Sequence, residues 1–388
     1  MVKGYITTLM PILRFSEFNE DWREVRLGDL CENFKSGIGI TAEKIFSSGD
    51  FPVYGGNGLR GYTDRYTHDG YYLLIGRQGA LCGNINRANG KTYISEHAIA
   101  VSGNKYSNTE WLAQKLEYMR LNRLSESSAQ PGLSVNKLVR IKLVIPSQLE
   151  QQKIAAFLSA VDQKIQLLQR KKELLERYKK GVMQKLFSQE IRFKKEDGND
   201  YPEWEEKRLA EFLIPTLRRI HKPLLPYLAI GVRSHFRGTF QKPNFDPSKI
   251  NMDKLFIVRE GDLIVNITFA WEGAVALVKT EDDGGLVSHR FPTYTFNERK
   301  VLSKYFSYVF CQKRFKQILD LISPGGAGRN RVLNKKELLK VKQNFPSIPE
   351  QRKISELLTY LDNKIEFTDK EINRSNLFKR GLLQQMFV

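Results

Sequence analysis

The sequence predicts an α+β fold: two β-rich domains separated by two long helices that pack as an antiparallel coiled coil, with a pseudo-twofold internal repeat. Three observations lead to this prediction. The chain repeats itself at a shift of 200 residues, each repeat ends in a long heptad-like apolar stripe, and the rest alternates β-branched or aromatic runs with turn residues. At 388 residues the chain is also long enough for two domains of ordinary size.

The repeat is clearest where each long helix begins. The segment Pro146–Ile154 reads PSQLEQQKI, and Pro346–Ile354 reads PSIPEQRKI. The register then continues without a gap, since eight residues recur 200 positions later: Leu158, Asp162, Lys164, Ile165, Lys179, Gly181, Gln184 and Phe187 match Leu358, Asp362, Lys364, Ile365, Lys379, Gly381, Gln384 and Phe387. Upstream, the sequence around Trp22 resembles that around Trp204. The chain is therefore two copies of one unit.

Each tail carries an apolar stripe with alternating steps of four and three residues, which is the narrow seam of a coiled coil. The stripes are Ile154, Leu158, Val161, Ile165, Leu168, Lys172, Leu175, Lys179, Val182 and Leu186, and Ile354, Leu358, Leu361, Ile365, Thr368, Ile372, Ser375, Lys379, Leu382 and Met386. Two such helices in one chain can bury both apolar stripes by packing on each other, and we expect them to do so. Docking of each stripe on its own domain, or on a partner protein, stays open as an alternative.

The two bodies between the tails read mostly as strands and turns. Strands are expected at YYLLIG, TYISEHAIAV and VRIKLVIP in the first body, and at 256–258, 262–267 and 273–278 in the second. Helices are expected at 109–122 and 303–321, and Asn334 with Glu337 predicts the start of a short helix. The predicted organisation is an N-terminal tail (1–20), a first domain (21–147), a central helix (148–192), a second domain (193–346) and a distal helix (347–388).

Composition points to a nucleic-acid partner. The chain carries 62 Lys and Arg against 43 Asp and Glu, a formal charge of +19, and it has no apolar run long enough to span a bilayer. The N-terminal residues lack the features of a signal peptide. Three isolated cysteines exclude a disulfide framework and favour a reducing cytoplasm. The expected partner is therefore a polyanion, and no membrane contact is expected.

A glycine-rich run, YGGNGLRGY at 54–62, fits the GxGxxG pattern of dinucleotide-binding loops. That pattern requires a helix directly after the last glycine, but Gly61 is followed by YTDRYTHDGYYLLIG, which has no helical period. We therefore predict no cofactor here. The span Tyr54–Tyr72 is interpreted as a turn-rich connection whose glycines present Asn57 and Arg60.

Catalytic motifs are missing from the rest of the sequence. The histidines show no HxxxH or HExxH spacing, and there is neither a GxxxxGK[ST] nor an NPPY-like segment. Pro202–Lys207 contains an ExK but lacks the second element of a nuclease, and is interpreted as a structural start to the second body. No catalytic, cofactor-binding or metal-binding residue is predicted.

The remaining candidates are cationic and amide side chains on loops, of the kinds that read bases or neutralise phosphate. The predicted DNA-binding residues are Arg60, Arg77, Gln78, Arg87, His97, Asn136, Lys137, Arg233, Arg237, Arg290, Arg329 and Arg331.

The architecture resembles the DNA-specificity subunit of type I restriction-modification enzymes, which act in defence against foreign DNA. The repeated P-S-x-x-E-Q-x-K-I, the long helices that it opens and the run VYGGNGLRGYTDRY…LLIGRQGALCGNI carry this resemblance. It implies two target-recognition domains that each read one half of a bipartite site in double-stranded DNA, and a coiled coil that spaces them.

The same resemblance implies a non-catalytic subunit that docks two methyltransferase and two restriction/translocase subunits, to which S-adenosylmethionine, ATP and Mg would belong. Residues of the repeated motif are expected at the partner contacts: Glu150, Gln151, Ile154, Glu350, Gln351 and Ile354. Two alternatives stay open, a stand-alone nucleic-acid-binding regulator and a single-chain nuclease or methyltransferase with diverged motifs.

Overall fold

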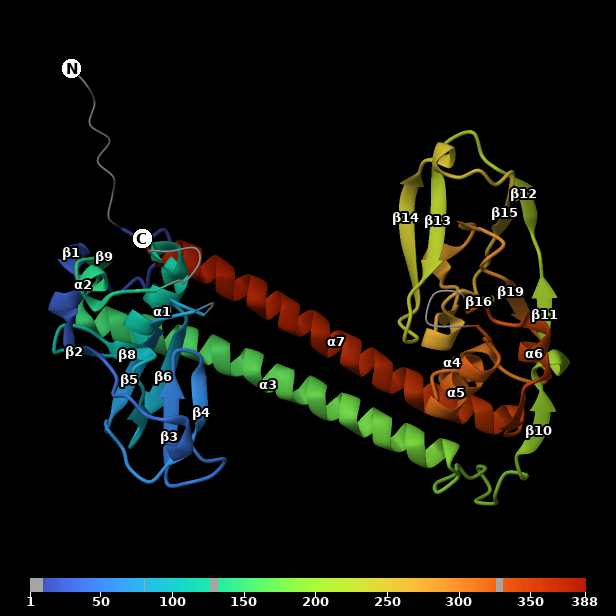
Figure 1. Ribbon diagram of the computed structural model, residues 1–388, viewed down its shortest axis with the longest axis horizontal. Helices are drawn as coiled ribbons and strands as arrows, with labels where there is room; N and C mark the ends of the chain where they lie inside the picture. Colours follow the sequence, from blue (N-terminus) through green and yellow to red (C-terminus); the bar gives the residue numbers. More distant parts are fainter. Residues whose placement is uncertain (1–9, 80, 126–131, 326–330) are drawn as a thin grey trace. The chain divides into compact units, whose positions relative to one another are not determined.

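The computed structural model describes residues 10–79, 81–125, 132–325 and 331–388 (Figure 1). The chain forms two compact units: unit 1 contains Met1–Glu173 and Phe367–Val388, and unit 2 contains Leu174–Glu366. The long helices α3 (Gln148–Phe187) and α7 (Ile348–Met386) both contribute to both units. Each unit thus combines a β-rich body with the first half of one long helix and the second half of the other.

Among its described residues, unit 1 contains three sheets and two α-helices besides its parts of α3 and α7. In chain order its elements are β1 (Arg23–Arg26), β2 (Cys31–Ser36), β3 (Phe51–Gly55), β4 (Gly58–Thr63), β5 (Tyr71–Gly76), β6 (Ile85–Asn89), β7 (Tyr93–Ile94), β8 (Ala98–Gly103), α1 (Thr109–Met119), α2 (Val135–Leu138) and β9 (Lys142–Ile145). The sheets have the strand orders β2-β8-β5-β6, β4-β3-β7 and β1-β9. The antiparallel pair β1-β9 joins the beginning and the end of the body.

The core of unit 1 lies where the sheet, α1 and the long helices meet. Strand β5 sits between β8 and β6, and its Leu73 and Ile75 are fully buried with Trp111 of α1. From the far end of the chain, Leu382 and Phe387 join the same core cluster. The last turns of α7 therefore complete the hydrophobic core of the first body.

Unit 2 repeats this plan, with one sheet of five strands where unit 1 has three. Its elements are β10 (Glu205–Arg208), β11 (Leu213–Thr216), β12 (Arg219–His221), β13 (Tyr227–Val232), β14 (Thr239–Phe245), β15 (Lys254–Ile257), β16 (Leu263–Val265), β17 (Val275–Leu277), β18 (Leu286–Val287), β19 (Thr293–Phe296), α4 (Ser303–Val309), α5 (Lys313–Leu321), α6 (Lys335–Lys340) and β20 (Lys342–Phe345). Its sheets have the orders β12-β15-β18-β13-β14, β11-β19-β16-β17 and β10-β20. The pair β10-β20 corresponds to β1-β9.

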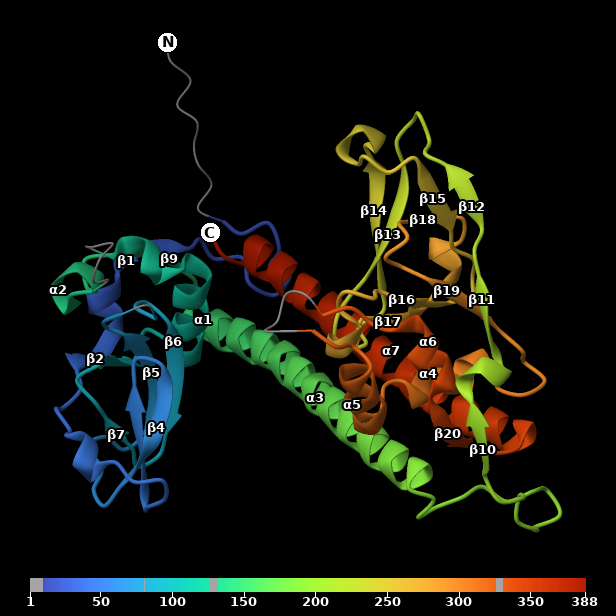
Figure 2. The same ribbon diagram turned by 45° about the vertical axis from the view of Figure 1, so that its right-hand side comes forward.

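The predicted coiled coil is confirmed within each unit, where α3 and α7 run side by side (Figures 1 and 2). In unit 1, Lys379 Nζ lies 2.6 Å from Asp162 Oδ1, and Lys172 Nζ lies 2.5 Å from Asp369 Oδ1. The higher number on one helix pairs with the lower number on the other, which is the order of an antiparallel pair. The apolar stripes serve two purposes, because Ile154 and Leu158 also pack into the core of unit 1. Helix pairing and docking on the body, posed as alternatives, therefore both occur.

Some expected elements differ in the structure. The strand expected at TYISEHAIAV is divided into β7 and β8. The single helix expected at 303–321 is divided into α4 and α5, because Gln312 is extended at ψ 144° and its side chain donates a hydrogen bond to Tyr308 O. This break brings the ring of Phe315 to 5.8 Å from that of Phe306 in the core. The turn-rich connection expected from Tyr54 is wrong over its first half, which forms the β3-β4 hairpin.

Helix ends follow the local sequence. Asn334 Oδ1 accepts hydrogen bonds from Lys336 N and Glu337 N, which confirms the predicted start of α6. Helix α1 begins after Asn108, whose Oδ1 accepts from Trp111 N, and it ends at Arg120 with φ 53°, earlier than expected.

Candidate nucleic-acid interface

The GxGxxG run of unit 1 forms the tip of the β3-β4 hairpin. Gly58 adopts φ +93°, a conformation that glycine tolerates, and Asn57 lies exposed at the turn. The register shifts here: Val53 faces Gly61, and Tyr54 faces Leu59. Arg60 is thus the extra residue of a β-bulge, a feature that redirects a side chain, and Arg60 is exposed. The glycines shape a turn and a bulge.

Two other candidate segments pack beside this hairpin tip. A Cβ at Gly56 would lie 2.7 Å from His97 O and 3.5 Å from Arg77 N, so the three backbones are in close contact. Arg77 N donates to His97 O at 3.0 Å, and the next residue, Gln78, bridges to Gly132. The fold therefore gathers Arg60, Arg77, Gln78 and His97, which are spread over 38 positions of sequence, around one hairpin tip.

The side chains of this group face solvent to different degrees. Arg60, Gln78 and His97 are exposed and Arg77 is half-buried. His97 Nε2 lies 3.4 Å from Oε1 of its acidic sequence neighbour, Glu96. We refer to Arg60, Arg77, Gln78 and His97 as the unit 1 patch.

Asn136 and Lys137 lie on the short helix α2 and both are exposed. The loop before α2 is held to the patch, since Leu133 N donates to Arg77 O at 2.9 Å. Lys137 Nζ donates to Leu124 O at 3.0 Å. Asn136 and Lys137 therefore lie on a segment that contacts the unit 1 patch.

Arg87 has a different role from the expected one. Its guanidinium donates to Glu110 Oε2 at 2.8 Å and to Glu117 Oε1 at 2.9 Å, which ties β6 to α1. These two carboxylates raise the pKa of Arg87 against the opposing effect of burial. A guanidinium held in this way is not available for phosphate or base, so the assignment of Arg87 to DNA binding is corrected to a structural ion pair.

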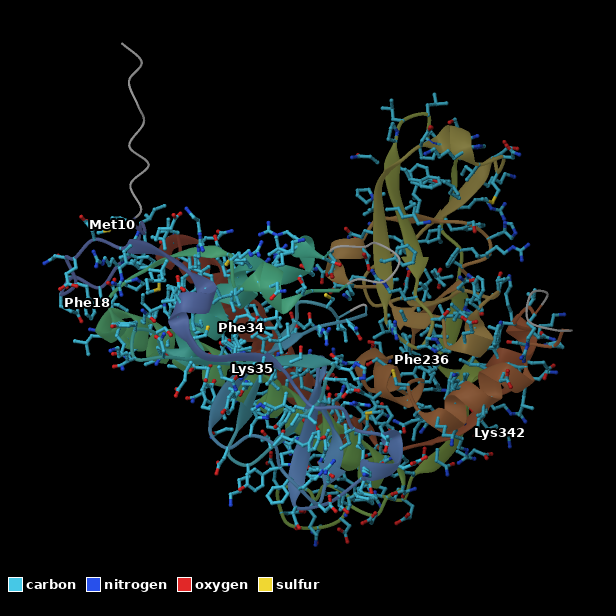
Figure 3. All side chains as sticks on the ribbon, turned by 60° about the vertical axis from the view of Figure 1, so that its left-hand side comes forward. Met10, Phe18, Phe34, Lys35, Phe236 and Lys342 are labelled. Carbon is cyan, nitrogen blue, oxygen red and sulfur yellow. The ribbon has the colours of Figure 1, made fainter. Side chains whose placement is uncertain are left out.

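In unit 2, Arg233 and Arg237 belong to the loop between β13 and β14, and both are exposed. The loop rests on the short 3-10 turn η6 (Ala270–Glu272): Phe236 N donates to Gly273 O at 2.8 Å, and Ser234 Oγ donates to Glu272 Oε2 at 2.6 Å. Figure 3 labels Phe236 at this position, where it has positive φ. The loop is therefore firmly supported. Arg237 is exposed, and the exposed Arg233 also donates to Thr239 O at 2.5 Å and lies over the Phe240 ring.

Arg290 and Arg331 lie on the segments that flank the same turn. Ile267 N donates to Arg290 O at 3.0 Å, and the Arg331 guanidinium lies 5.0 Å from the centre of the Trp271 ring of η6. Arg290 is exposed, whereas the Arg331 guanidinium is held as that of Arg87 is: it pairs with Asp320 at 2.7 Å and donates to Ser323 O at 3.0 Å, so Arg331 is also a structural contact. We refer to Arg233, Arg237 and Arg290 as the unit 2 patch. Arg329 lies outside the described residues.

The repeated-motif residues expected to bind a partner are buried instead. Glu150, Gln151, Ile154, Glu350, Gln351 and Ile354 are at most 2% exposed. Arg14 donates two hydrogen bonds of 2.7 Å to the Glu150 carboxylate, and Gln151 Oε1 accepts from Asn108 N at 2.9 Å.

The second copy repeats this arrangement in unit 2. Arg192 donates to the Glu350 carboxylate at 2.9 and 3.1 Å, and Gln351 Oε1 accepts from Leu302 N. These six residues therefore fix each helix start to its own body, whereas other residues of the motif, such as Leu149, Gln152 and Lys153, are exposed. Sequence reasoning missed Arg14 and Arg192, because they are not related by the 200-residue shift.

Residues suited to metal chemistry are not brought together in the described structure. No group of three or more His, Cys, Asp or Glu side chains that could hold a metal ion occurs among the described residues. Within the same ranges, no helix combines the length and apolar character needed to cross a membrane.

Comparison with known proteins identifies the family. A family model for the type I restriction modification DNA specificity domain matches residues 19–177 and 201–375. One match falls in each repeat and together they span most of the chain. The chain therefore belongs to the family of type I restriction-modification DNA specificity proteins, as the resemblance predicted.

Individual relatives agree with this assignment. The specificity subunit of the Escherichia coli type I restriction enzyme EcoprrI is 42% identical over 155 residues, which cover 39% of this chain and 38% of that protein. The Methanocaldococcus jannaschii MjaVIII specificity subunit is 23% identical over 393 residues, or 94% of this chain and 91% of its relative. The crystal structure of the type I restriction-modification S subunit from M. genitalium has the same fold, with a TM-score of 0.67, 16% identity and coverage of 98% and 99%.

Proposed function

We propose that this chain is the DNA-specificity subunit of a type I restriction-modification complex and reads a bipartite, gapped site in double-stranded DNA. The observation that carries the proposal is the duplication: two bodies of one family, each with a patch of cationic side chains, joined by paired helices. One body would read each half-site, and the helices would set the unread gap. The difference in sequence and sheet size between the bodies fits two different half-sites.

The chain would act without a catalytic centre of its own. Methyltransferase and restriction/translocase subunits, two of each, would supply catalysis and hold S-adenosylmethionine, ATP and Mg, and the complex would work in the cytoplasm. The net charge of +19 supports the DNA-binding part of the proposal, because such a field attracts polyanions. A stand-alone regulator and a single-chain nuclease or methyltransferase are the alternatives that an experiment must separate.

Methylation mapping separates these functions. The chain is co-expressed with candidate methyltransferase subunits, and modified adenines are mapped on host DNA. We expect a gapped motif that is methylated only when both proteins are present. Methylation by the chain alone would support the single-chain enzyme. Sequence-specific binding by the pure chain, with no dependence of methylation on it, would support the regulator.

The two patches are tested by matched substitutions. Arg60→Ala is expected to relax the first half-site only, and Arg237→Ala the second half-site only, each base contact being worth about 1–3 kcal/mol of discrimination. Arg87→Ala serves as the control, since its guanidinium is held by carboxylates: stability should fall while the recognised motif stays the same. Unchanged motifs and affinity in both Arg60→Ala and Arg237→Ala would contradict the assignment of the patches.

A further inference from the structure

Unit 2 contains a cavity whose lining is rich in aromatic side chains. It has a volume of about 530 Å³ and lies between β13, β14, β15, β18 and the turn η6. That volume falls within the range of about 300–1,000 Å³ that small-molecule sites occupy. Five aromatic residues line it: Tyr227, Phe240, Phe245, Phe269 and Phe291. We refer to this space as the aromatic cavity.

Phe269 has the most open ring of this set. Its side chain is 43% exposed although its backbone is fixed: Phe269 N donates to Asn266 O at 3.1 Å, and Phe269 O accepts from Glu272 N at 3.0 Å. Trp271 in the same turn differs, because the Arg331 guanidinium lies over its ring. An aromatic ring that is firmly placed and open to solvent is a surface on which a flat ring can stack.

Two polar side chains in the lining suit the edge of a nucleobase. Glu272 Oε2 accepts from Ser234 Oγ at 2.6 Å, which holds the carboxylate in place, and a carboxylate oxygen accepts readily from an exocyclic amino group. Asn266 Oδ1 accepts from Thr268 N at 3.1 Å, so the amide nitrogen is the donor end of this side chain. The cavity thus combines a stacking ring with an acceptor and a donor.

Cations lie beside the aromatic cavity. The Arg233 guanidinium lies 5.0 Å and the Lys242 ammonium 5.6 Å from the centre of the Phe240 ring, and both cations are exposed. Arg290 N donates to Ser288 Oγ at 3.3 Å, and Ser288 belongs to the lining. Arg233 and Arg290 are also members of the unit 2 patch. Aromatic rings with cations next to them form the pattern that binds a base together with its phosphate.

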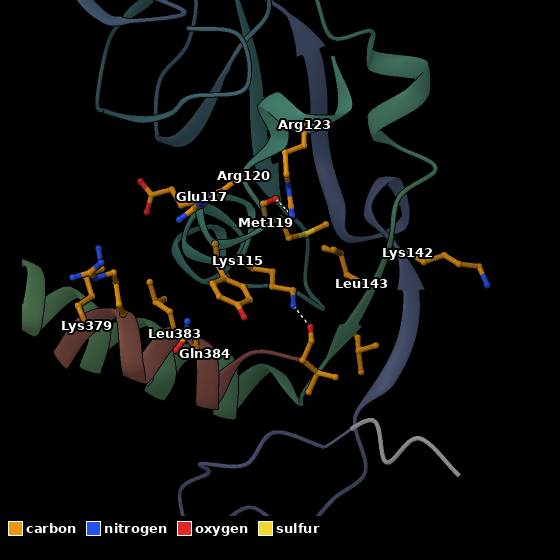
Figure 4. Close-up of a pocket in the computed structure, with 14 residues that line it drawn as sticks. Lys115, Glu117, Met119, Arg120, Arg123, Lys142, Leu143, Lys379, Leu383 and Gln384 are labelled. Atoms are coloured by element: carbon orange, nitrogen blue, oxygen red, sulfur yellow. Dashed lines mark hydrogen bonds between the residues drawn. The ribbon is translucent and has the colours of Figure 1, made fainter. Parts of the chain in front are cut away.

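A cavity of unit 1 has a different chemistry (Figure 4). Its volume is about 720 Å³, and it lies between the end of α1 with the segment after it, β9 and the last turns of α7. Cationic side chains dominate its described lining, which includes one aromatic ring, that of Tyr118. Figure 4 shows Lys115 donating a hydrogen bond to Val388 O there. A basic cavity of this kind does not select a flat, uncharged base, so the inference concerns unit 2.

We propose that the aromatic cavity takes one nucleobase that is turned out of the bound duplex and carries an exocyclic amino group. The base stacks on Phe269, its amino group donates to Glu272, and its phosphate meets Arg233 and Lys242. This inference rests on the proposed function, which places double-stranded DNA on the unit 2 patch. Turning a base out of the duplex costs stacking and pairing free energy, and the contacts inside the cavity offset part of that cost. The second domain then recognises one position through the cavity and others from the grooves.

Fluorescence of 2-aminopurine locates the extruded base. The full chain, assembled with the methyltransferase subunit that gives methylation in the mapping experiment, is bound to duplexes that carry the mapped site. 2-Aminopurine replaces, one at a time, each base of the second half-site and its flanks other than the methylated adenines. Because this analogue brightens when it leaves the stack, we expect brightening of about threefold or more at one position.

Two variants test the roles of the ring and the carboxylate. Phe269→Leu removes the aromatic ring and keeps an apolar side chain, so the brightening should disappear. The matched control is Phe378→Leu, at an exposed phenylalanine of α7 outside the aromatic cavity, which should brighten as the wild type does. Glu272→Gln keeps an acceptor for Ser234 and weakens the contact with the amino group. Its affinity should fall about threefold or more for the normal site, and should equal that of wild type when a base analogue without the amino group stands at that position.

Brightening that is retained in Phe269→Leu, or that occurs at no position, would overturn the inference and leave the proposed function intact, because methylation mapping tests that function separately. An equal loss of affinity in Glu272→Gln with and without the amino group would also overturn it, and would make Glu272 a support of the loop alone. If Phe269→Leu unfolds at a lower urea concentration than wild type, the Glu272→Gln comparison decides. A wild-type chain that directs no methylation would contradict the proposed function itself.

Discussion

Lys179 Nζ lies 2.5 Å from Asp362 Oδ1, which joins α3 to α7 within unit 2. The same pair occurs in unit 1 as Lys379 with Asp162, and both members lie 200 positions from their counterparts. Lys179 and Lys379 are polar members of the two apolar stripes. In the observed alignment Lys179 with Asp362, Lys172 with Asp369 and Lys379 with Asp162 are all paired at once, so these ion pairs favour the register of the antiparallel helices.

Reversing one charge of this pair should destabilise unit 2. Asp362→Lys places an ammonium group opposite Lys179 and removes the acceptor of the Tyr308 hydroxyl, which donates to Asp362 Oδ2 at 3.0 Å. We expect a loss of about 1–2 kcal/mol in urea unfolding, partly regained in the swap Lys179→Asp with Asp362→Lys. Glu356→Lys, at an exposed position of the same helix, is the control. A swap that is no more stable than Asp362→Lys alone would contradict the register role.

Lengthening the helices should change only the gap in the recognised site. Four residues inserted after Glu173 add about 6 Å to α3. Because α7 pairs with α3 in each unit, a matched insertion at Thr368 is needed to keep the ion pairs in register. We expect methylation mapping to show both half-sites unchanged and a gap longer by about one or two base pairs. An altered half-site with an unaltered gap would refute the spacer role.

Removal of Arg14 should be costly. Its guanidinium is the partner of the fully buried Glu150, so Arg14→Ala leaves a buried carboxylate without its counter-charge. We expect a loss of about 3–5 kcal/mol in the free energy of unfolding, and a similar loss for Arg192→Ala in unit 2. The exposed pair of Arg170 with Glu173 supplies the control, and Arg170→Ala should cost less than about 1 kcal/mol. Equal losses for Arg14→Ala and Arg170→Ala would show that burial of Glu150 is unimportant.

Lys115 predicts a pH dependence of stability. Its side chain is 3% exposed, and burial lowers its pKa from 10.5 to about 8. Between these two values the unfolded chain binds more protons than the folded chain, so the free energy of unfolding should rise with pH from about 8 to 10.5. Below pH 8 the charged, buried amine imposes its full cost. Urea unfolding should show that Lys115→Met gains most over wild type at pH 7.5 and progressively less toward pH 10; a constant difference would contradict the low pKa.

Gly61 should tolerate no side chain. It adopts φ +150°, and a Cβ would lie 2.6 Å from both Ile45 Cγ2 and Phe46 O. We expect Gly61→Ala to cost about 1–3 kcal/mol in urea unfolding and to disturb the bulge that presents Arg60. Gly39→Ala is a matched control, because its Cβ would have open space. Equal stability of the two variants would show that the hairpin adapts to the added carbon.

The internal repeat and the apolar stripes sufficed to predict the two long helices and their pairing. Both the spacing of the apolar residues, 3.5 on average, and the repeat after 200 residues can be read directly from the sequence. The break before Lys313 was not predictable, since it arises from the packing of Phe315 on Phe306 and from a hydrogen bond of the Gln312 side chain. Tertiary contact decides such a break, whereas the local sequence favours one helix.

The sequence predicted which types of residue form the candidate interface, but it predicted only partly which of them lie together. Arg60, Arg77 and His97 converge because the β3-β4 tip packs on two other loops, a contact that no local pattern signals. Arg87 looks the same in sequence, but two glutamates about two helical turns apart on α1, Glu110 and Glu117, hold it. The burial of Glu150 and Gln151 likewise depends on contacts with residues distant in sequence, and a repeated polar motif alone does not reveal it.

The participation of the last turns of α7 in the core of unit 1 has a consequence for biosynthesis. A chain made from its N-terminus presents the first body early, but Leu382, Met386 and Phe387 belong to the core of that body and are made last. Unit 2, which ends at Glu366, has all its residues available sooner. The unit that is begun first is therefore the one whose core is finished last, and the ribosome must complete nearly the whole chain before unit 1 can close.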